Sequence, residues 1–206
     1  MIRTALQNPD DADFPDEETR QIILRTQAWI EKAVIGLNLC PFAKAVHAKR
    51  QIRYAVSDAK SPKQLHRDLV IELRHLSATD PAVLDTTLLI HPLVLRDFLD
   101  YNDFLEVADA AVEEEDLDGE IQVASFHPDY QFAGTEVNDI DNFSNRSPYP
   151  TLHLLREASI ETAVAAFPEA SEIYEKNIAT MHALGRPGWD ALFADDTETA
   201  PASPEK

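Results

Sequence analysis

The sequence predicts a single α/β domain with a small, mostly parallel sheet of three to four strands, flanked by helices and followed by a helical C-terminal third. Three apolar runs, 51–57, 86–91 and 120–126, have the lengths and residue types of buried or half-buried strands. Helical patterns separate them, and strands that alternate with helices usually lie parallel because right-handed crossovers connect them. A fourth strand is expected, if present, within 128–145.

Helices are expected wherever apolar residues recur at helical spacing between breakers. Before the third strand run, the predicted helices cover 16–40, 41–49, 61–77 and 96–116. In the last third, we expect helices that start at Ser147 or Thr151, run from Ser159 to Pro168 and cover 169–184, with 186–194 as a helical anchor through Trp189.

Both ends of the chain are acidic and poor in large apolar residues. This composition predicts a disordered lead-in over 1–15 and a disordered tail over 195–206, around a domain of 16–194. No apolar run approaches the roughly 20 residues that cross a bilayer, and no signal-peptide core is present. A lone cysteine, Cys40, fits a reducing cytoplasm.

The charge balance restricts the classes of partner. The net charge of the chain is -19, and 44% of its residues are hydrophobic. An acidic body without a basic stripe disfavours nucleic acid and anionic membrane surfaces as partners. The surface charge also supports solubility, and a local basic pocket for a small anion stays open.

Two His-Pro pairs end predicted strands. His91-Pro92 follows the second strand run and His127-Pro128 follows the third. If these strands are parallel, both imidazoles reach the carboxyl edge of the sheet, where open α/β sheets bind ligands. Asp129 would orient His127 as an acid or base, or would form a turn bond with the backbone. The alternative is that each His-Pro pair only ends a strand.

A second polar group precedes the helix expected from Ser147 or Thr151. Arg146 would lie beside free N–H groups at that helix start, which predicts an anion clamp. The alternative pairs Arg146 with a local acid such as Asp139 or Asp141. His153, on the same expected helix, would complete the site or belong to the core. The predicted anion-binding residues are Asn142, Asn145, Arg146, Ser147, Tyr149 and His153.

Cys40 lies at a predicted corner between two helices, where helix N–H groups would lower the pKa of its thiol and make it a nucleophile. A buried, inert cysteine is the alternative. The remaining histidines are interpreted as surface residues: His47, His66, His75 and His182.

Cofactor motifs are absent from the sequence. It has no Walker loop, GxGxxG or HExxH, and its five glycines do not form a phosphate cradle, so no nucleotide cofactor is expected. His91 and His127, with Cys40 or His153, remain candidates for Zn or Fe, although their spacing matches no metal motif.

Four segments together resemble a known family: CPFAK at 40–44, LLIHP at 88–92, ASFHPDYQFAG at 124–134 and NRSPYPTLHLLRE at 145–157. Over residues 20–185 the chain is similar to the bacterial domain-of-unknown-function family 1415. The resemblance implies a bacterial cytoplasmic protein and transfers no activity or catalytic role.

The residues themselves therefore carry the functional prediction. We expect an enzyme that acts on a small anionic metabolite, with His127 or His91 as acid or base, Cys40 as a possible nucleophile and Arg146 holding the anion. The alternatives are a Zn or Fe enzyme or sensor that uses His91 and His127, and a non-catalytic adaptor whose acidic surface meets a basic partner.

Overall fold

The computed structural model describes residues 2–6, 16–166 and 172–194. Its elements in chain order are β1 (Ile2–Leu6), α1 (Glu17–Trp29), the π-helix η1 (Ile30–Ile35), α2 (Ala43–Ala48), β2 (Ile52–Ser57), α3 (Pro62–Ala78), β3 (Thr86–Ile90), α4 (Phe98–Glu114), β4 (Ile121–Phe126), the 3-10 helix η2 (Ile140–Asn145), β5 (Thr151–Arg156), α5 (Glu157–Ala166) and α6 (Ile173–Leu192).

The sheet differs from the predicted one in strand number and direction. Within the described residues it contains five strands in the order β1-β2-β3-β5-β4. β2 and β3 are parallel, whereas the β1–β2, β3–β5 and β5–β4 pairs are antiparallel. The α/β class is therefore confirmed, and the prediction of a mostly parallel sheet is wrong because β5 inserts between β3 and β4 and runs against both.

Two strands lie where the sequence predicted other structure. β5 replaces the helix expected from Ser147 or Thr151: Leu152 and Leu154 point to one side of the sheet and are fully buried, with His153 between them. β1 lies within the expected disordered lead-in and pairs antiparallel with β2. Residues 7–15 and 195–206 fall outside the described part of the chain.

Most predicted helices are confirmed. α1 with η1, α2, α3 and α4 match the four helices expected in the first part of the chain. Asp16, Ser61 and Asp97 cap the N-termini of α1, α3 and α4 by accepting backbone N–H bonds. The expected anchor is also found, because Trp189 is buried and packs edge-to-face on Phe143.

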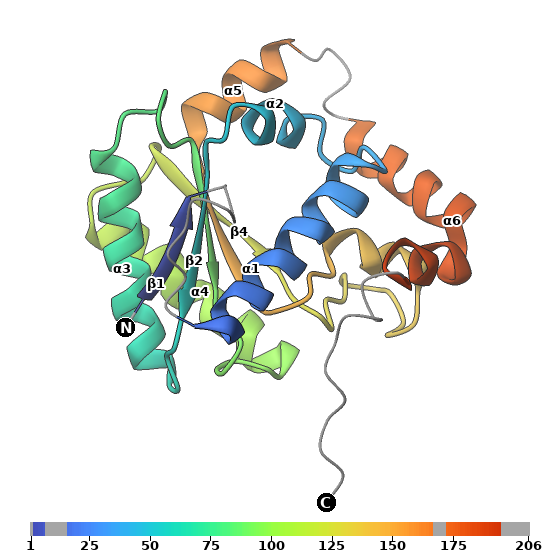
Figure 1. Cartoon of the computed structure of the whole chain (residues 1–206), viewed down its shortest axis with the longest axis horizontal. Coiled ribbons are helices and arrows are strands. Elements are labelled where there is room, and N and C mark those ends of the chain that lie inside the picture. Colours follow the sequence, from blue (N-terminus) through green and yellow to red (C-terminus); the bar gives the residue numbers. More distant parts are fainter. Residues whose placement is uncertain (1, 7–15, 167–171, 195–206) are drawn as a thin grey trace, which may run out of the picture.

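Strand alternation gives the sheet two different faces. On one face, Ala55, Leu89 and Leu152 join the core formed with α3 and α4. On the other, Tyr54 and Leu88 join the core formed with α1 and η1. Figure 1 shows α3 and α1 on opposite sides of the sheet, with α2 above and α6 beyond α1. We call the second surface the α1 face.

No helix in the described residues is long and apolar enough to cross a membrane.

Candidate functional site

The two strand-end histidines lie at the same end of the sheet, as the His-Pro pairs predicted. His91 follows β3 and His127 follows β4, and both rings contact Tyr101 of α4, with centroid distances of 5.7 and 5.0 Å. Phe98 packs on Tyr101, on His127 and on Tyr130. We call these five residues the strand-end cluster. Both histidines are 0% exposed.

His127 is held by protein groups at both ring nitrogens. Its Nδ1 accepts a hydrogen bond from the Asp129 backbone N–H (3.0 Å), and its Nε2 lies 3.2 Å from the Leu95 carbonyl oxygen, to which it donates. Asp129 therefore orients the imidazole through its backbone. Burial lowers the pKa of His127, which keeps the ring neutral. In this arrangement no ring nitrogen of His127 remains for a substrate.

His91 has one satisfied nitrogen and one without a partner. Nδ1 lies 3.0 Å from the Val94 carbonyl oxygen, which only accepts, so Nδ1 carries the hydrogen. Nε2 is then a lone-pair acceptor that is buried and has no hydrogen-bond partner within residues 2–6, 16–166 and 172–194. Burial lowers the pKa of His91 to about 4. His91 is thus a neutral core residue at pH 7.

Arg146 does not lie at a helix start, because β5 occupies the place of the expected helix. Its Nε donates to the Tyr130 carbonyl (3.2 Å), its Nη2 donates to the Val137 carbonyl (2.6 Å), and its guanidinium lies 4.2 Å from the Phe143 ring centroid. These contacts tie the 130–137 loop to η2. The helix-terminus part of the anion-clamp prediction is therefore wrong.

The other predicted anion-binding residues also bond to nearby protein groups. Asn142 is fully buried, accepts from Phe132 N–H and donates to the Glu136 carbonyl. The Asn145 carbonyl accepts from His127 N–H at 3.3 Å. Ser147 Oγ donates to the Tyr149 carbonyl at 2.6 Å. Tyr149 Oη lies 3.4 Å from Arg25 Nη1. These bonds shape the connection from β4 to β5.

Among the described residues, further buried polar atoms without protein partners lie on the α1 face. Tyr54, in the middle of β2, is 0% exposed, and its hydroxyl has no hydrogen-bond partner within the described ranges. Tyr54, Leu88 and His153 are successive neighbours across β2, β3 and β5, so Leu88 forms a floor between the two polar side chains. The β2 and β5 backbones are then about 10 Å apart.

His153 lies on β5 and faces the α1 side, rather than on a helix as predicted. Thr86 Oγ1 donates to the Leu154 carbonyl (2.6 Å), so the 2.7 Å contact between Thr86 Oγ1 and His153 Nε2 is a hydrogen bond donated by the imidazole. Nδ1 of the neutral ring is left as an acceptor. Burial lowers the pKa of His153 to about 4, and the Phe126 ring packs 5.9 Å away.

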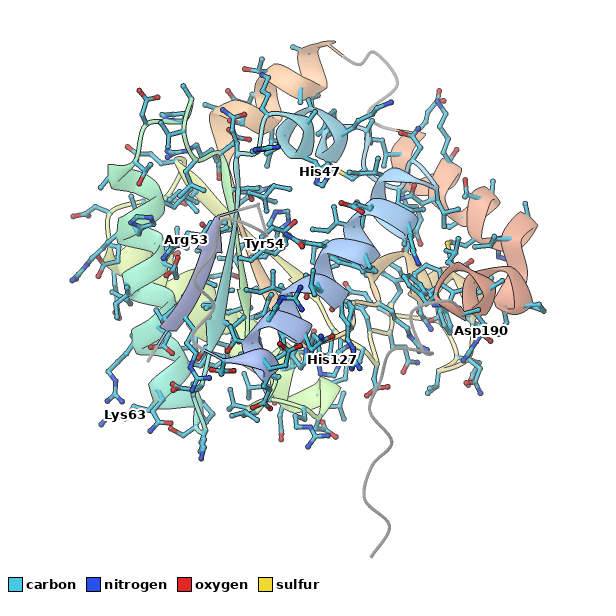
Figure 2. The ribbon with its side chains drawn as sticks, in the orientation of Figure 1. His47, Arg53, Tyr54, Lys63, His127 and Asp190 are labelled. Carbon is cyan, nitrogen blue, oxygen red and sulfur yellow. The ribbon has the colours of Figure 1, made fainter. Side chains whose placement is uncertain are left out.

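His47, interpreted from the sequence as a surface residue, is partly buried over the α1 face. Its Nε2 lies 3.4 Å from Glu31 Oε1, and its Nδ1 is buried, with no hydrogen-bond partner in the part of the chain that the structure describes. Burial and, as the smaller cause, the negative charge of Glu31 raise the pKa of Tyr54. Figure 2 shows His47 and Tyr54 in the space between α2, α1 and the sheet, with His127 far below them.

We call Glu31, His47, Tyr54, Thr86, Phe126 and His153 the sheet-face site. Sequence patterns pointed to only one member, His153. The structure adds a second local indication. Glu31 lies within the π-helix η1, and π-helical turns are frequent at functional sites.

Cys40 packs against the α1-face core, separate from the strand-end cluster. Its thiol interacts with the backbone N–H groups of Phe42 and Ala43, yet burial has the larger effect and raises its pKa. The thiol therefore stays protonated near pH 7, which fits the inert alternative better than the nucleophile.

The metal alternative has no ligand set in the described part of the chain. No group of three or more His, Cys, Asp or Glu side chains is arranged there to hold an ion. His91 and His127 also use ring nitrogens on backbone carbonyls.

The fold and site define an α/β protein with polar groups on one face of a mixed sheet. The chain belongs to the family described as Protein of unknown function (DUF1415), whose model matches residues 21–191. This membership confirms the resemblance of the four motif segments. No curated protein and no solved structure matches the chain.

Acid should weaken the fold through His91. Above pH 6.5 the imidazole is neutral in both the folded and the unfolded chain, so the free energy of unfolding has its full value with respect to this residue. Between pH 6.5 and about 4 the unfolded chain binds a proton that the folded chain does not, so stability falls. The expected loss is roughly 3 kcal/mol. Urea unfolding from pH 7 to 4 measures it.

His91→Asn retains a hydrogen-bond donor for the Val94 carbonyl but has no group that binds a proton in this pH range. The free energy of unfolding of this variant should therefore fall less between pH 7 and 4 than that of the wild type. The exposed His75→Asn is the matched control and should leave the slope unchanged. An unchanged slope in His91→Asn would show that His91 does not cause the loss.

Arg146→Ala should lower the free energy of unfolding by about 1–3 kcal/mol, because two charge-assisted hydrogen bonds to backbone carbonyls are lost. Chemical denaturation checks this, with the exposed Arg96→Ala as control. A free anion clamp would give the opposite result, in which stability is retained and only the response to added anions disappears.

Proposed function

We propose that the protein is an enzyme that binds a small molecule at the sheet-face site and acts on it by histidine acid–base chemistry. One observation supports this most directly: Tyr54 is fully buried, yet its hydroxyl has no partner within the described structure. Buried polar groups in folded proteins are nearly always hydrogen-bonded, so an exception calls for a partner outside the chain. A bound molecule supplies one.

His47 is the proposed general base. Glu31 faces its Nε2 at 3.4 Å, and because a carboxylate only accepts, Nε2 carries a hydrogen. In the neutral ring, Nδ1 then has a lone pair, and this atom is buried without a protein partner. The carboxylate also stabilises the imidazolium that forms when Nδ1 takes a proton, as in other carboxylate–histidine pairs.

The other members have supporting roles in this proposal. Tyr54 donates its hydroxyl hydrogen, because burial and the Glu31 charge disfavour the phenolate. His153, neutral and with its tautomer set by Thr86, presents Nδ1 as an acceptor that positions the substrate. The proposal retains histidine chemistry and assigns it to His47. It does not use His127, whose two ring nitrogens are bonded, or His91, whose Nδ1 contacts the Val94 carbonyl.

Two buried tyrosines provide a direct test of the unpartnered hydroxyl. Tyr54→Phe should leave the free energy of unfolding unchanged or raised, because it removes a buried polar group that has no bond. Tyr101→Phe should lower it by about 1–3 kcal/mol, since the Tyr101 hydroxyl donates to the Thr151 carbonyl and accepts from Phe126 N–H. Equal losses in urea titrations of both variants would mean that Tyr54 also has a structural partner.

Turnover is tested by incubating the full chain with a defined metabolite panel and following each compound by mass spectrometry. Wild-type protein should deplete at least one compound, and His47→Gln should reduce that rate by roughly 100-fold or more, as expected when a general base is lost. His75→Gln is the control on an exposed histidine. Depletion that persists in His47→Gln would exclude His47 as the base.

A further inference from the structure

We infer that the substrate presents an ammonium or similar donor-rich cationic group to Glu31, His47 and Tyr54. This inference rests on the proposed function and names the substrate class of the same site. A cationic substrate group thus takes the place of the small anion that the sequence predicted.

The first argument is the hydrogen-bonding character of the site. Glu31 contributes carboxylate oxygens, and His47 contributes its buried Nδ1, which is an acceptor in the tautomer whose Nε2–H faces Glu31. His153 contributes a second imidazole lone pair, because Thr86 accepts the hydrogen of its Nε2. Tyr54 adds a hydroxyl that both accepts and donates. Acceptors thus outnumber donors, and a ligand rich in N–H groups satisfies them.

The second argument is charge. The Glu31 side chain is 57% exposed, so its charge is accessible from solvent. The whole chain carries a net charge of -19. Such a field concentrates cations and disfavours anions at the site.

The third argument is the apolar wall beside these acceptors. Phe126 packs edge-to-face on Trp29 at 5.0 Å and lies 5.9 Å from the His153 ring. Leu88 forms the floor between Tyr54 and His153. Aromatic rings attract organic cations through their faces and bury hydrocarbon. An amine attached to a flat or apolar body matches both parts of the site.

The chemistry of the proposed base agrees with this ligand. An ammonium group bonded to His47 Nδ1 can transfer one proton to it, which leaves a neutral amine and an imidazolium next to the Glu31 carboxylate. The amine then has a free lone pair, so the site would prepare it as a nucleophile. Proton and charge are conserved in this step.

The test uses three probes with the same ring and different head groups: benzylamine, benzyl alcohol and benzoate. Binding to the full-length chain is measured at pH 7 by ligand-observed NMR titration. Benzylamine should bind with a Kd on the order of 1–10 mM, as expected for a ligand of this size. It should bind at least ten-fold more tightly than benzyl alcohol or benzoate.

Two substitutions locate the binding. Glu31→Gln should weaken the binding of benzylamine at least ten-fold, so that benzylamine no longer binds more tightly than benzyl alcohol. Glu161→Gln, at an exposed position on α5, is the matched control and should leave all three affinities unchanged. Both variants are compared with wild type in urea unfolding, so that a change in folding is not mistaken for a change in binding.

Three outcomes would overturn the inference: benzoate binding as tightly as benzylamine, benzylamine binding equally well to Glu31→Gln, or no saturable benzylamine binding. Failure here is separable from failure of the proposed function. Turnover of compounds that lack an amine, when lost in His47→Gln, would reject the amine and leave the acid–base site in place. Equal destabilisation by Tyr54→Phe and Tyr101→Phe would instead undermine the site itself.

Discussion

The insertion of β5 between β3 and β4 is the constraint on which the rest of the structure depends. Its ladders to both neighbours are antiparallel. Alternation along β5 sends Leu152 and Leu154 into the core under α3 and α4 and leaves His153 on the α1 face. The same insertion separates His91 from His127 by one strand, so the two rings meet through Tyr101. One strand therefore builds a sealed cluster at the sheet end and a polar position on the sheet face.

The strand-end cluster and the sheet-face site differ more in the hydrogen bonding of their buried polar atoms than in their residue types. In the strand-end cluster, the Tyr101 hydroxyl bridges the Thr151 carbonyl and the Phe126 N–H, and both nitrogens of His127 are bonded. Such bonds contribute to stability and leave few atoms for a ligand. Among the described residues, the buried atom of this cluster without a partner is His91 Nε2, whereas on the α1 face Tyr54 and His47 each have such an atom. The proposed function therefore uses the region with fewer histidine–backbone bonds.

Local sequence patterns predicted most helices and the strands β2, β3 and β4, because each has its own periodicity and a clear breaker. They did not predict β5, since Leu152, Leu154 and Leu155 fit both a helix face and a strand, and Ser147-Pro148 resembles a helix start. Its place in the sheet depends on pairing with β3, which lies far away in the sequence. β1 was missed because the acidic residues that follow it dominate the composition of the N-terminal segment.

The candidate site was predictable only in part, for a related reason. The two His-Pro pairs placed His91 and His127 at one end of the sheet. The backbone carbonyls of Val94 and Leu95 that contact their rings lie in the connection after β3, and the sequence pattern does not predict the path of that connection. Tyr54 looked like an ordinary inward residue of a strand. A phenylalanine would fill the same space, and the described structure gives the hydroxyl no partner. Under the proposed function, a molecule bound beside Tyr54 would supply this partner, so the proposal depends more on the missing bond than on the predicted His-Pro motif.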